Sequence, residues 1–265
     1  MVDLEGIEQL APFVKSLMLG TARMIGFFLF LPVLSPQWVS GAMRTAVIIA
    51  LSSPIIVHVH TTFHEAGFTS HISTMFFIIK EVALGVLLGF GSALIFWAVQ
   101  ASGFLIDNQR GATIASSYDP LSGNQASPIG MMMLNVFIMY FILSGGLLIL
   151  LSALYISYGF WPVESVFPRI TFSVVLFMLE RLDFLARLAV LIAAPVVMTM
   201  MLSEFALALV SRFATQLNVF SVAFSIKSGI AIFMLYLYVG ILFPYLRREF
   251  FEIEFTIEAL EVLVQ

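Results

Sequence analysis

The feature that most restricts the fold of this chain is a succession of apolar runs, several of them long enough to cross a bilayer core of about 30 Å. Only 11% of the residues are charged and 61% are hydrophobic, whereas soluble domains carry about 25% charged residues. Backbone that faces lipid must satisfy its own hydrogen bonds, so only helices and closed barrels span membranes. The runs lack the dyad alternation of barrel strands. The sequence therefore predicts an all-α membrane protein, with apolar runs at 13–34, 41–59, 74–100, 129–158, 170–179, 188–210, 213–224 and 229–246.

One polar stretch, Asp107–Gly130, interrupts this apolar pattern. It is rich in Gly, Ser, Asn and Gln, and it contains the turn-forming sequences Asp119-Pro120 and Ser122-Gly123-Asn124. Irregular backbone at membrane depth survives only inside protein or beside water. The stretch is therefore either an ordinary loop outside the membrane or part of an aqueous path that the apolar segments surround. Its few aliphatic residues can bury little surface, so its order would have to come from a surrounding assembly.

Three consecutive methionines, Met131, Met132 and Met133, follow the polar stretch directly. Methionine is flexible and fills irregular gaps, which suits a deformable seal. It is equally common in ordinary helix cores. Both interpretations stay open from the sequence.

Charged residues inside or beside the apolar runs point to partners. A charge at the bilayer centre costs at least about 2.5–3.5 kcal/mol, so such charges pair with one another, pack against other subunits or line water. Neighbouring residues do not face each other on a helix, so Lys80 and Glu81 are expected to pair elsewhere rather than form a proton relay. Glu204 and Arg212 lie two turns apart, too far for a direct bridge, which leaves pairing between subunits open. The charges that need partners are Arg23, Lys80, Glu81, Arg187, Glu204, Arg212 and Lys227.

Several functional classes find no support in the sequence. His60 and His64 are four apart with Glu65 adjacent, but nothing else completes a metal site. There is no glycine-rich phosphate loop, no H-E-x-x-H and no nucleophile elbow, so neither an enzyme nor a cofactor is expected. The chain has no cysteine, and its net charge of −4 argues against nucleic acid as a partner.

Two features concern neighbours of the apolar segments. Gly85, Gly89 and Ala93 follow one another at four-residue spacing, which lets another helix come close. The C-terminal tail places Glu254, Glu258 and Glu261 on one helical face. Anionic lipid attracts basic faces, so this acidic face favours a protein partner.

The arginines at 247 and 248 place the end of the last span in the cytoplasm, and the acidic N-terminus predicts that the first helix is retained.

Several short segments of the chain are specific enough to compare with known families: Asp119-Pro120-Leu121-Ser122-Gly123, Ala194-Pro195-Val196, Arg212-Phe213, Gln216-Leu217-Asn218-Val219-Phe220 and Ile226-Lys227. Together they closely resemble the SctT/FliR family, the export-apparatus proteins of bacterial type III secretion systems and flagella. The resemblance extends from the helix of Arg23 to about Leu246. The sequence of these segments is more similar to the injectisome branch of the family than to the flagellar branch. Thr215 and Ala208 depart from the family pattern, which usually has Pro and Gly there.

The resemblance implies an export gate. One copy would join SctR/FliP-like and SctS/FliQ-like sister subunits in a pseudo-helical ring of bent helical hairpins. Residues 1–178 would correspond to one sister and residues 179–265 to the other. The polar stretch would form part of a plug in the lumen, near a methionine gasket that a sister subunit mainly supplies. The plug residues would be Arg110, Gly111, Ser116, Ser117, Tyr118, Asp119, Pro120, Leu121, Ser122, Gly123, Asn124, Gln125 and Pro128.

The expected function is therefore a non-enzymatic core subunit of a type III export gate in the bacterial inner membrane. It would pass unfolded proteins, and its further partners would be the SctU/FlhB-like switch protein, the export-gate ring and membrane lipid. A rival interpretation is a secondary transporter for a small solute, with Lys80, Glu81 and Glu204 as a coupling site and Pro195 marking a broken helix. No inverted repeat is evident in support of that rival.

Overall fold

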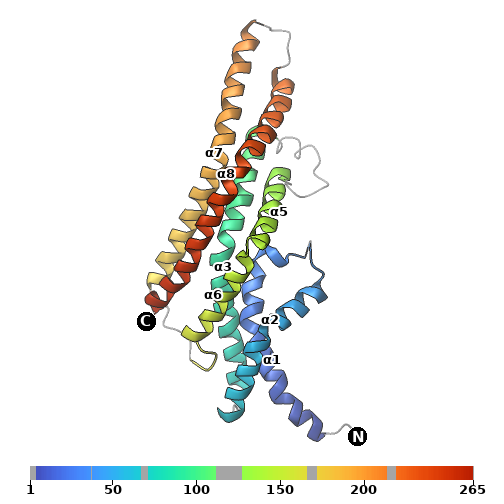
Figure 1. Cartoon of the computed structure of the whole chain (residues 1–265), viewed down its shortest axis with the longest axis vertical. Helices are drawn as coiled ribbons and strands as arrows, with labels where there is room; N and C mark the ends of the chain where they lie inside the picture. The colour runs from blue at the N-terminus through green and yellow to red at the C-terminus, as the bar shows by residue number, and fades with distance from the viewer. Residues whose placement is uncertain are drawn as a thin grey trace. The chain divides into compact units, whose positions relative to one another are not determined.

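The computed structural model describes residues 4–36, 38–66, 71–111, 127–165, 172–213 and 219–264. Within these residues every regular element is a helix (Figure 1), which confirms the prediction of an all-α membrane protein. In chain order the elements are α1 (Leu4–Phe30), the 3-10 helix η1 (Pro32–Leu34), α2 (Gly41–Ala66), α3 (His71–Arg110), α5 (Pro128–Leu143), α6 (Gly146–Phe160), α7 (Phe172–Phe213) and α8 (Val219–Val264).

Five of these helices are long and apolar enough to cross a membrane, and the α5–α6 pair adds a sixth span if it counts as one broken segment. Proline and glycine explain two of the boundaries. Pro32 forces Leu31 into an extended conformation, with ψ 125°, and α1 ends just before it. The run 129–158 is divided at Ser144 and Gly145, where Gly145 has φ +80°, a conformation that glycine adopts without steric cost.

α7 and α8 are longer than the apolar runs predict. The charged segment after Leu179 does not end α7, which continues for 42 residues. Asp183 and Arg187 lie one turn apart and form an ion pair of 2.6 Å with both side chains mostly exposed. Charged residues are compatible with a helix when they lie on an exposed face. α8 extends over 46 residues to Val264, so the expected helix of the tail is present, while the side chains of its acidic face lie outside the described residues.

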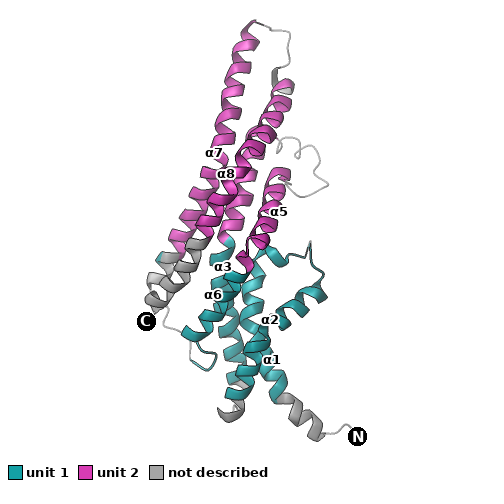
Figure 2. Ribbon diagram, viewed as in Figure 1, with its two compact units in different colours: residues 1–93, 148–176, 256–265 teal, residues 94–147, 177–255 magenta. Residues whose placement is uncertain are grey.

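The chain divides into two compact units (Figure 2). Unit 1 contains residues 1–93, 148–176 and 256–265, and unit 2 contains residues 94–147 and 177–255. α3 belongs to both units, because the division falls at Ala93. The expected boundary at residue 178 is a division of a different kind, because it separates the halves that would each correspond to one sister subunit. That boundary stays a prediction.

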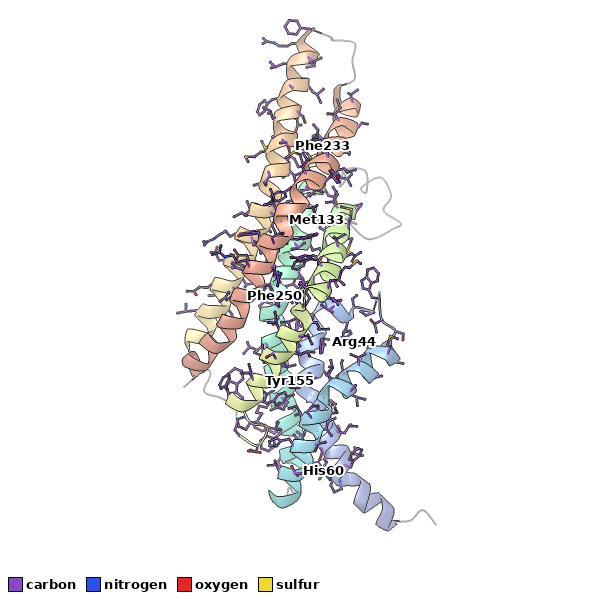
Figure 3. All side chains as sticks on the ribbon, in the orientation of Figure 1. Arg44, His60, Met133, Tyr155, Phe233 and Phe250 are labelled. Atoms are coloured by element: carbon purple, nitrogen blue, oxygen red, sulfur yellow. The ribbon has the colours of Figure 1, made fainter. Side chains whose placement is uncertain are left out.

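In unit 1, α1 and α3 touch through glycine. A Cβ atom added at Gly85 would collide with the carbonyl oxygen of Arg23, and one added at Gly89 would collide with that of Phe27. The predicted close approach at these small residues is confirmed, and its partner is α1 of the same chain. α6 is attached to α2 by Tyr155, labelled in Figure 3, whose hydroxyl donates to the carbonyl of Leu51 at 2.5 Å.

In unit 2, an aromatic cluster joins α3, α5 and α8. The ring of Phe96 lies 5.2 Å from that of Phe137 and 5.0 Å from that of Phe141. Phe250, labelled in Figure 3, packs edge-on against Phe141 at 4.6 Å. Aromatic pairs in these arrangements add about 0.5–1.5 kcal/mol beyond the burial of their area. This cluster therefore holds the membrane-spanning part of α8 against α5.

Candidate functional site

The first candidate site is a buried charge cluster in unit 1. Arg23 on α1 donates from Nε to Glu81 Oε2 at 2.7 Å and from Nη2 to Glu81 Oε1 at 3.1 Å. Both side chains are 0% exposed. This two-pronged arrangement matches the planar guanidinium to the carboxylate, which makes it the strongest geometry for such a pair. It is possible because glycine brings α1 and α3 close together beside Arg23.

Lys80 completes the cluster and holds the segment after α6. Its Nζ lies 3.0 Å from Glu81 Oε1. The same ammonium donates to the carbonyl oxygens of Pro162, Val163 and Ser165 at 3.1, 2.9 and 2.9 Å. Both residues have partners elsewhere, as expected, but the expectation that Lys80 and Glu81 do not face each other is wrong. The side chain of Lys80 is 1% exposed, so its long flexible stem turns back to the neighbouring carboxylate instead of reaching solvent.

Arg23 also contacts α6 and the segment that follows it. Its guanidinium donates to Ser157 Oγ at 3.0 Å and to the carbonyl oxygen of Trp161 at 2.6 Å, and it lies 3.9 Å from the ring centre of Tyr158. Two cations thus share one carboxylate, and backbone carbonyls supply most of the remaining acceptors. Such a cluster is suited to joining α1, α3 and α6, because Arg23 on α1 donates both to Glu81 on α3 and to Ser157 on α6.

The second candidate site is the base of the polar stretch, in unit 2. α3 ends at Arg110 and is followed by Gly111 with φ +85°, a common way to end a helix. α5 begins at Pro128, and Ser127 caps it by accepting from the backbone N–H of Gly130 at 3.0 Å. A serine cap followed by proline is a typical helix start. The described parts of the polar stretch, residues 107–111 and 127–130, thus lie at the ends of two regular helices.

Asp107 joins these two helix ends. Its Oδ2 accepts from Ser127 Oγ at 2.6 Å and from the backbone N–H of Ile129 at 2.9 Å, while its Oδ1 accepts from Arg110 Nε at 2.6 Å. The residue is 1% exposed. A Cβ atom added at Gly103 would collide with the backbone of Gly130, so glycine allows the close contact. The polar stretch therefore begins and ends at one place in unit 2.

Lys227 on α8 contacts the same place. Its Nζ donates to the carbonyl oxygen of Gln109 at 3.0 Å and lies 3.4 Å from Glu204 Oε2 on α7. Gln109 Nε2 in turn lies 3.4 Å from that carboxylate oxygen. Lysine favours the carbonyl end of a helix, where the helix dipole is negative. The α7–α8 hairpin is thereby attached to the last turn of α3.

The structure brings together some of the residues that the sequence singled out and leaves others apart. Arg23, Lys80 and Glu81 form one cluster, and Glu204 meets Lys227. Arg212 is exposed in this chain. Arg110, Gly111 and Pro128 lie at the base of the polar stretch, while the other plug candidates fall outside the described residues: Ser116, Ser117, Tyr118, Asp119, Pro120, Leu121, Ser122, Gly123, Asn124 and Gln125.

The three methionines that follow the polar stretch have different surroundings. Met131 Sδ lies 3.5 Å from Gln100 Nε2. Met133 is buried, whereas Met132 is 49% exposed and lines an apolar groove of about 310 Å³ with Val136 and Tyr236. Met132 is therefore the methionine of this run that presents its side chain outward. The seal proposed for this run stays a prediction.

Sequence reasoning missed Asp107 and Ser127 as a pair. Asp107 was only the first residue of the polar stretch, although the Ser127-Pro128 dipeptide is a helix-start signal that could have identified the far end. Nothing in the sequence connects Asp107 with a residue twenty positions later. The contact depends on how α3 and α5 pack, which spacing along the chain does not reveal.

The described residues define a multi-pass helical membrane protein in which buried ion pairs connect the helices and a polar stretch is held at both ends. The model of a known protein family, described as "Bacterial export proteins, family 1", matches residues 14–253. The chain therefore belongs to this family, the SctT/FliR proteins of type III secretion and flagellar export.

Relatives from both kinds of system are similar to the chain. The Yop proteins translocation protein T of Yersinia pestis is 39% identical over 219 residues, which cover 82% of each chain. The surface presentation of antigens protein SpaR of Salmonella typhimurium is 36% identical over 233 residues, covering 87% of this chain and 85% of the relative. The flagellar biosynthetic protein FliR of Bacillus subtilis is 29% identical over 191 residues, covering 72% and 73%.

Proposed function

We propose that this protein is a core subunit of a type III export gate in the bacterial inner membrane. Together with SctR/FliP-like and SctS/FliQ-like sister subunits, it lines and closes a conduit for unfolded proteins, without enzymatic activity of its own. The observation that carries the proposal is the contact of Asp107 with Ser127 and Ile129. It holds both ends of a long polar stretch at the ends of two apolar helices, and such backbone at membrane depth requires protein or water around it.

The surface of α7 and α8 supports a multi-subunit setting. Large apolar side chains along both helices are exposed in this chain, including Leu202 at 71%, Phe213 at 91% and Tyr236 at 78%. The carboxylate of Glu204 is half exposed within the same apolar span. Lipid alone would cover the apolar groups but would leave this charge poorly solvated. Sister subunits would provide both apolar contacts and polar partners.

A secondary transporter for a small solute is not favoured. Its expected coupling residues Lys80 and Glu81 are buried and engaged with Arg23 and with fixed backbone carbonyls. A coupling site must exchange ions or protons with water on each side in turn, which requires groups that can be released. The family to which the chain belongs is described as bacterial export proteins.

The proposal can be tested by replacing residues 112–126 with a short Gly-Ser linker. This change keeps Gly111 and Ser127, so the ends of α3 and α5 retain their caps. The variant is produced with the sister subunits, and ion conductance of the reconstituted complex is measured. We expect conductance to rise while co-purification of the sister subunits is unchanged. An assembled complex with unaltered conductance would contradict the role of the stretch as a plug.

A further inference from the structure

We infer that Glu204 lies in a docking surface on α7 for an apolar helix of a sister subunit that carries a lysine or arginine side chain. The surface consists of Met201, Glu204, Phe205 and Ala208, all of them in unit 2. The inference rests on the proposed function, because it takes the neighbouring chain to be a sister subunit. It does not depend on the polar stretch or on what closes the conduit.

The carboxylate of Glu204 is partly paired within this chain. Its side chain is 52% exposed. Lys227 Nζ and Gln109 Nε2 each lie 3.4 Å from Oε2, whereas a hydrogen bond from an ammonium to a carboxylate is normally about 2.7–2.9 Å long. Within the part of the chain that the structure describes, both polar contacts reach Oε2. Oε1 is therefore available to a donor from another chain.

Lys227 approaches this carboxylate from the interior of unit 2. Its side chain is 8% exposed, and its shorter contact is the one to the carbonyl oxygen of Gln109, at 3.0 Å. The ammonium is thus directed mainly at the end of α3. The exposed part of the Glu204 side chain remains accessible, and a charge within an apolar span needs a polar or charged partner.

The residues around Glu204 indicate what kind of partner fits. Met201 lies one turn before it and Ala208 one turn after it, so the three side chains share one face of α7. Met201 is 45% and Phe205 67% exposed, and Ala208 is exposed as well. These neighbours are apolar, and the small side chain of alanine lets another helix come close. The surface therefore favours an apolar helix over an aqueous lining.

Charge complementarity identifies the group that this helix must carry. Lipid tails would cover Met201 and Phe205 but would leave the carboxylate poorly solvated. A lysine or arginine in an apolar helix meets both requirements, because its aliphatic stem packs against apolar side chains while its charged end reaches the carboxylate. Such a cation would approach Oε1, on the exposed side of Glu204.

The surface can be tested by photo-crosslinking of the full chain produced with the sister subunits in membranes. The photoreactive amino acid p-benzoylphenylalanine takes the place of Phe205, which preserves the aromatic ring beside Glu204. Mass spectrometry then identifies the residue to which it becomes attached. We expect an apolar helix of a sister subunit, with a lysine or arginine within one turn of that residue. Attachment to a helix without such a cation, attachment to a second copy of this chain, or the absence of any protein product would overturn the inference.

The charge is tested by Glu204→Gln, which preserves the shape of the side chain. The measurement is the amount of sister subunit recovered with the tagged chain in mild detergent. We expect recovery to fall by about 3-fold to 16-fold, the factors that correspond to about 0.6–1.7 kcal/mol for a polar contact between membrane helices. The matched control is Glu180→Gln, the same substitution at an exposed carboxylate in the charged segment of α7, which should leave recovery unchanged. Equal recovery for both variants would contradict the docking surface.

A second background separates a contact with a partner from an effect through Lys227. In Lys227→Met, the contact within this chain is already lost, so a contact with a sister subunit predicts that Glu204→Gln still lowers recovery. No further loss in that background would overturn the inference. Glu204→Lys should abolish recovery, and replacing the cation found by cross-linking with glutamate should restore it. Failure to restore recovery would also refute the pairing.

The outcomes also distinguish this inference from the proposed function. If the unchanged chain recovers no sister subunit, the proposed function fails and the docking surface fails with it. If the unchanged chain assembles and Glu204→Gln assembles equally well, the docking surface alone is refuted. The conductance of the linker replacement of residues 112–126 tests the plug and has no bearing on these recoveries.

Discussion

Glu81 lies at the centre of the buried charge cluster in unit 1. It is the acceptor for both Arg23 and Lys80, at 2.7 and 3.0 Å, and no part of its side chain is exposed. Buried ion pairs often contribute little net stability compared with well-packed apolar groups, because removing two charges from water is costly. Removing one partner is different, since it leaves the other charge uncompensated. We therefore expect the cluster to specify which helices meet, and the chain to be destabilised when one of its partners is removed.

The substitution Glu81→Gln tests this dependence. Two buried cations would lose the carboxylate that they share, so we expect the protein to be destabilised by about 3–5 kcal/mol. The measurement is the thermal unfolding of the purified complex. Asp183→Asn provides the control, because its ion pair with Arg187 is exposed and such pairs contribute about 0–1 kcal/mol. Similar melting temperatures for the two variants would show that the cluster is not a structural requirement.

At the scale of elements, the break between α5 and α6 depends on the backbone conformation of a single residue, Gly145. Gly145 has φ +80°, while the N–H of Ser144 donates to the carbonyl of Tyr140 at 2.9 Å. The residues on either side of Ser144-Gly145-Gly146 are apolar, so the apolar pattern predicts one run, whereas the serine and the two glycines are signals for a turn. Glycine makes the break inexpensive at this position, since other residues are strained in this conformation.

Gly145→Ala should destabilise the protein by about 1–2 kcal/mol, because alanine is strained at positive φ. Gly159→Ala is the matched comparison: this glycine lies inside α6, and an added Cβ would meet nothing within 4 Å. Alanine there should stabilise the helix by about 0.5–1 kcal/mol. Opposite shifts of the melting temperature are therefore expected. Shifts of the same sign would argue that the break at Gly145 does not depend on its backbone conformation.

At the scale of the whole molecule, the exposed surface of α7 and α8 predicts dependence on partners. Besides apolar side chains, the membrane-spanning part of α7 exposes about half of the Glu204 side chain, which carries a carboxylate. Polar and charged groups within membrane spans generally face other helices or water rather than lipid. Expressed alone, the protein should be degraded or aggregate. Expressed with the sister subunits, it should be recovered in a defined complex.

This expectation can be measured by affinity purification from membranes and mass spectrometry of what is recovered with the tagged chain. The half-life of the chain after synthesis stops provides a second measure, and co-expression should lengthen it severalfold. An isolated chain that is monodisperse in detergent and as long-lived as the co-expressed one would contradict a role as an obligate subunit.

The sequence by itself determined the fold class, most of the helix positions and the family. Apolar runs longer than the bilayer core leave few alternatives to helices, and the small-residue row at Gly85 and Gly89 identified a close helix contact. Charged residues within apolar runs, such as Lys80 and Glu204, also indicated that these side chains must have polar or charged partners. These properties are local or periodic along the chain, which is why they can be recognised without coordinates.

Only the tertiary structure decided which partners meet. It paired Glu81 with both Arg23 and Lys80, joined Asp107 to Ser127 and Ile129, and placed Lys227 at the end of α3. The physical reason is that each contact connects helices through side-chain reach and helix packing, over separations that no sequence period encodes. A buried charge must find an acceptor within about 3 Å, and only the assembled helices determine which acceptors lie there.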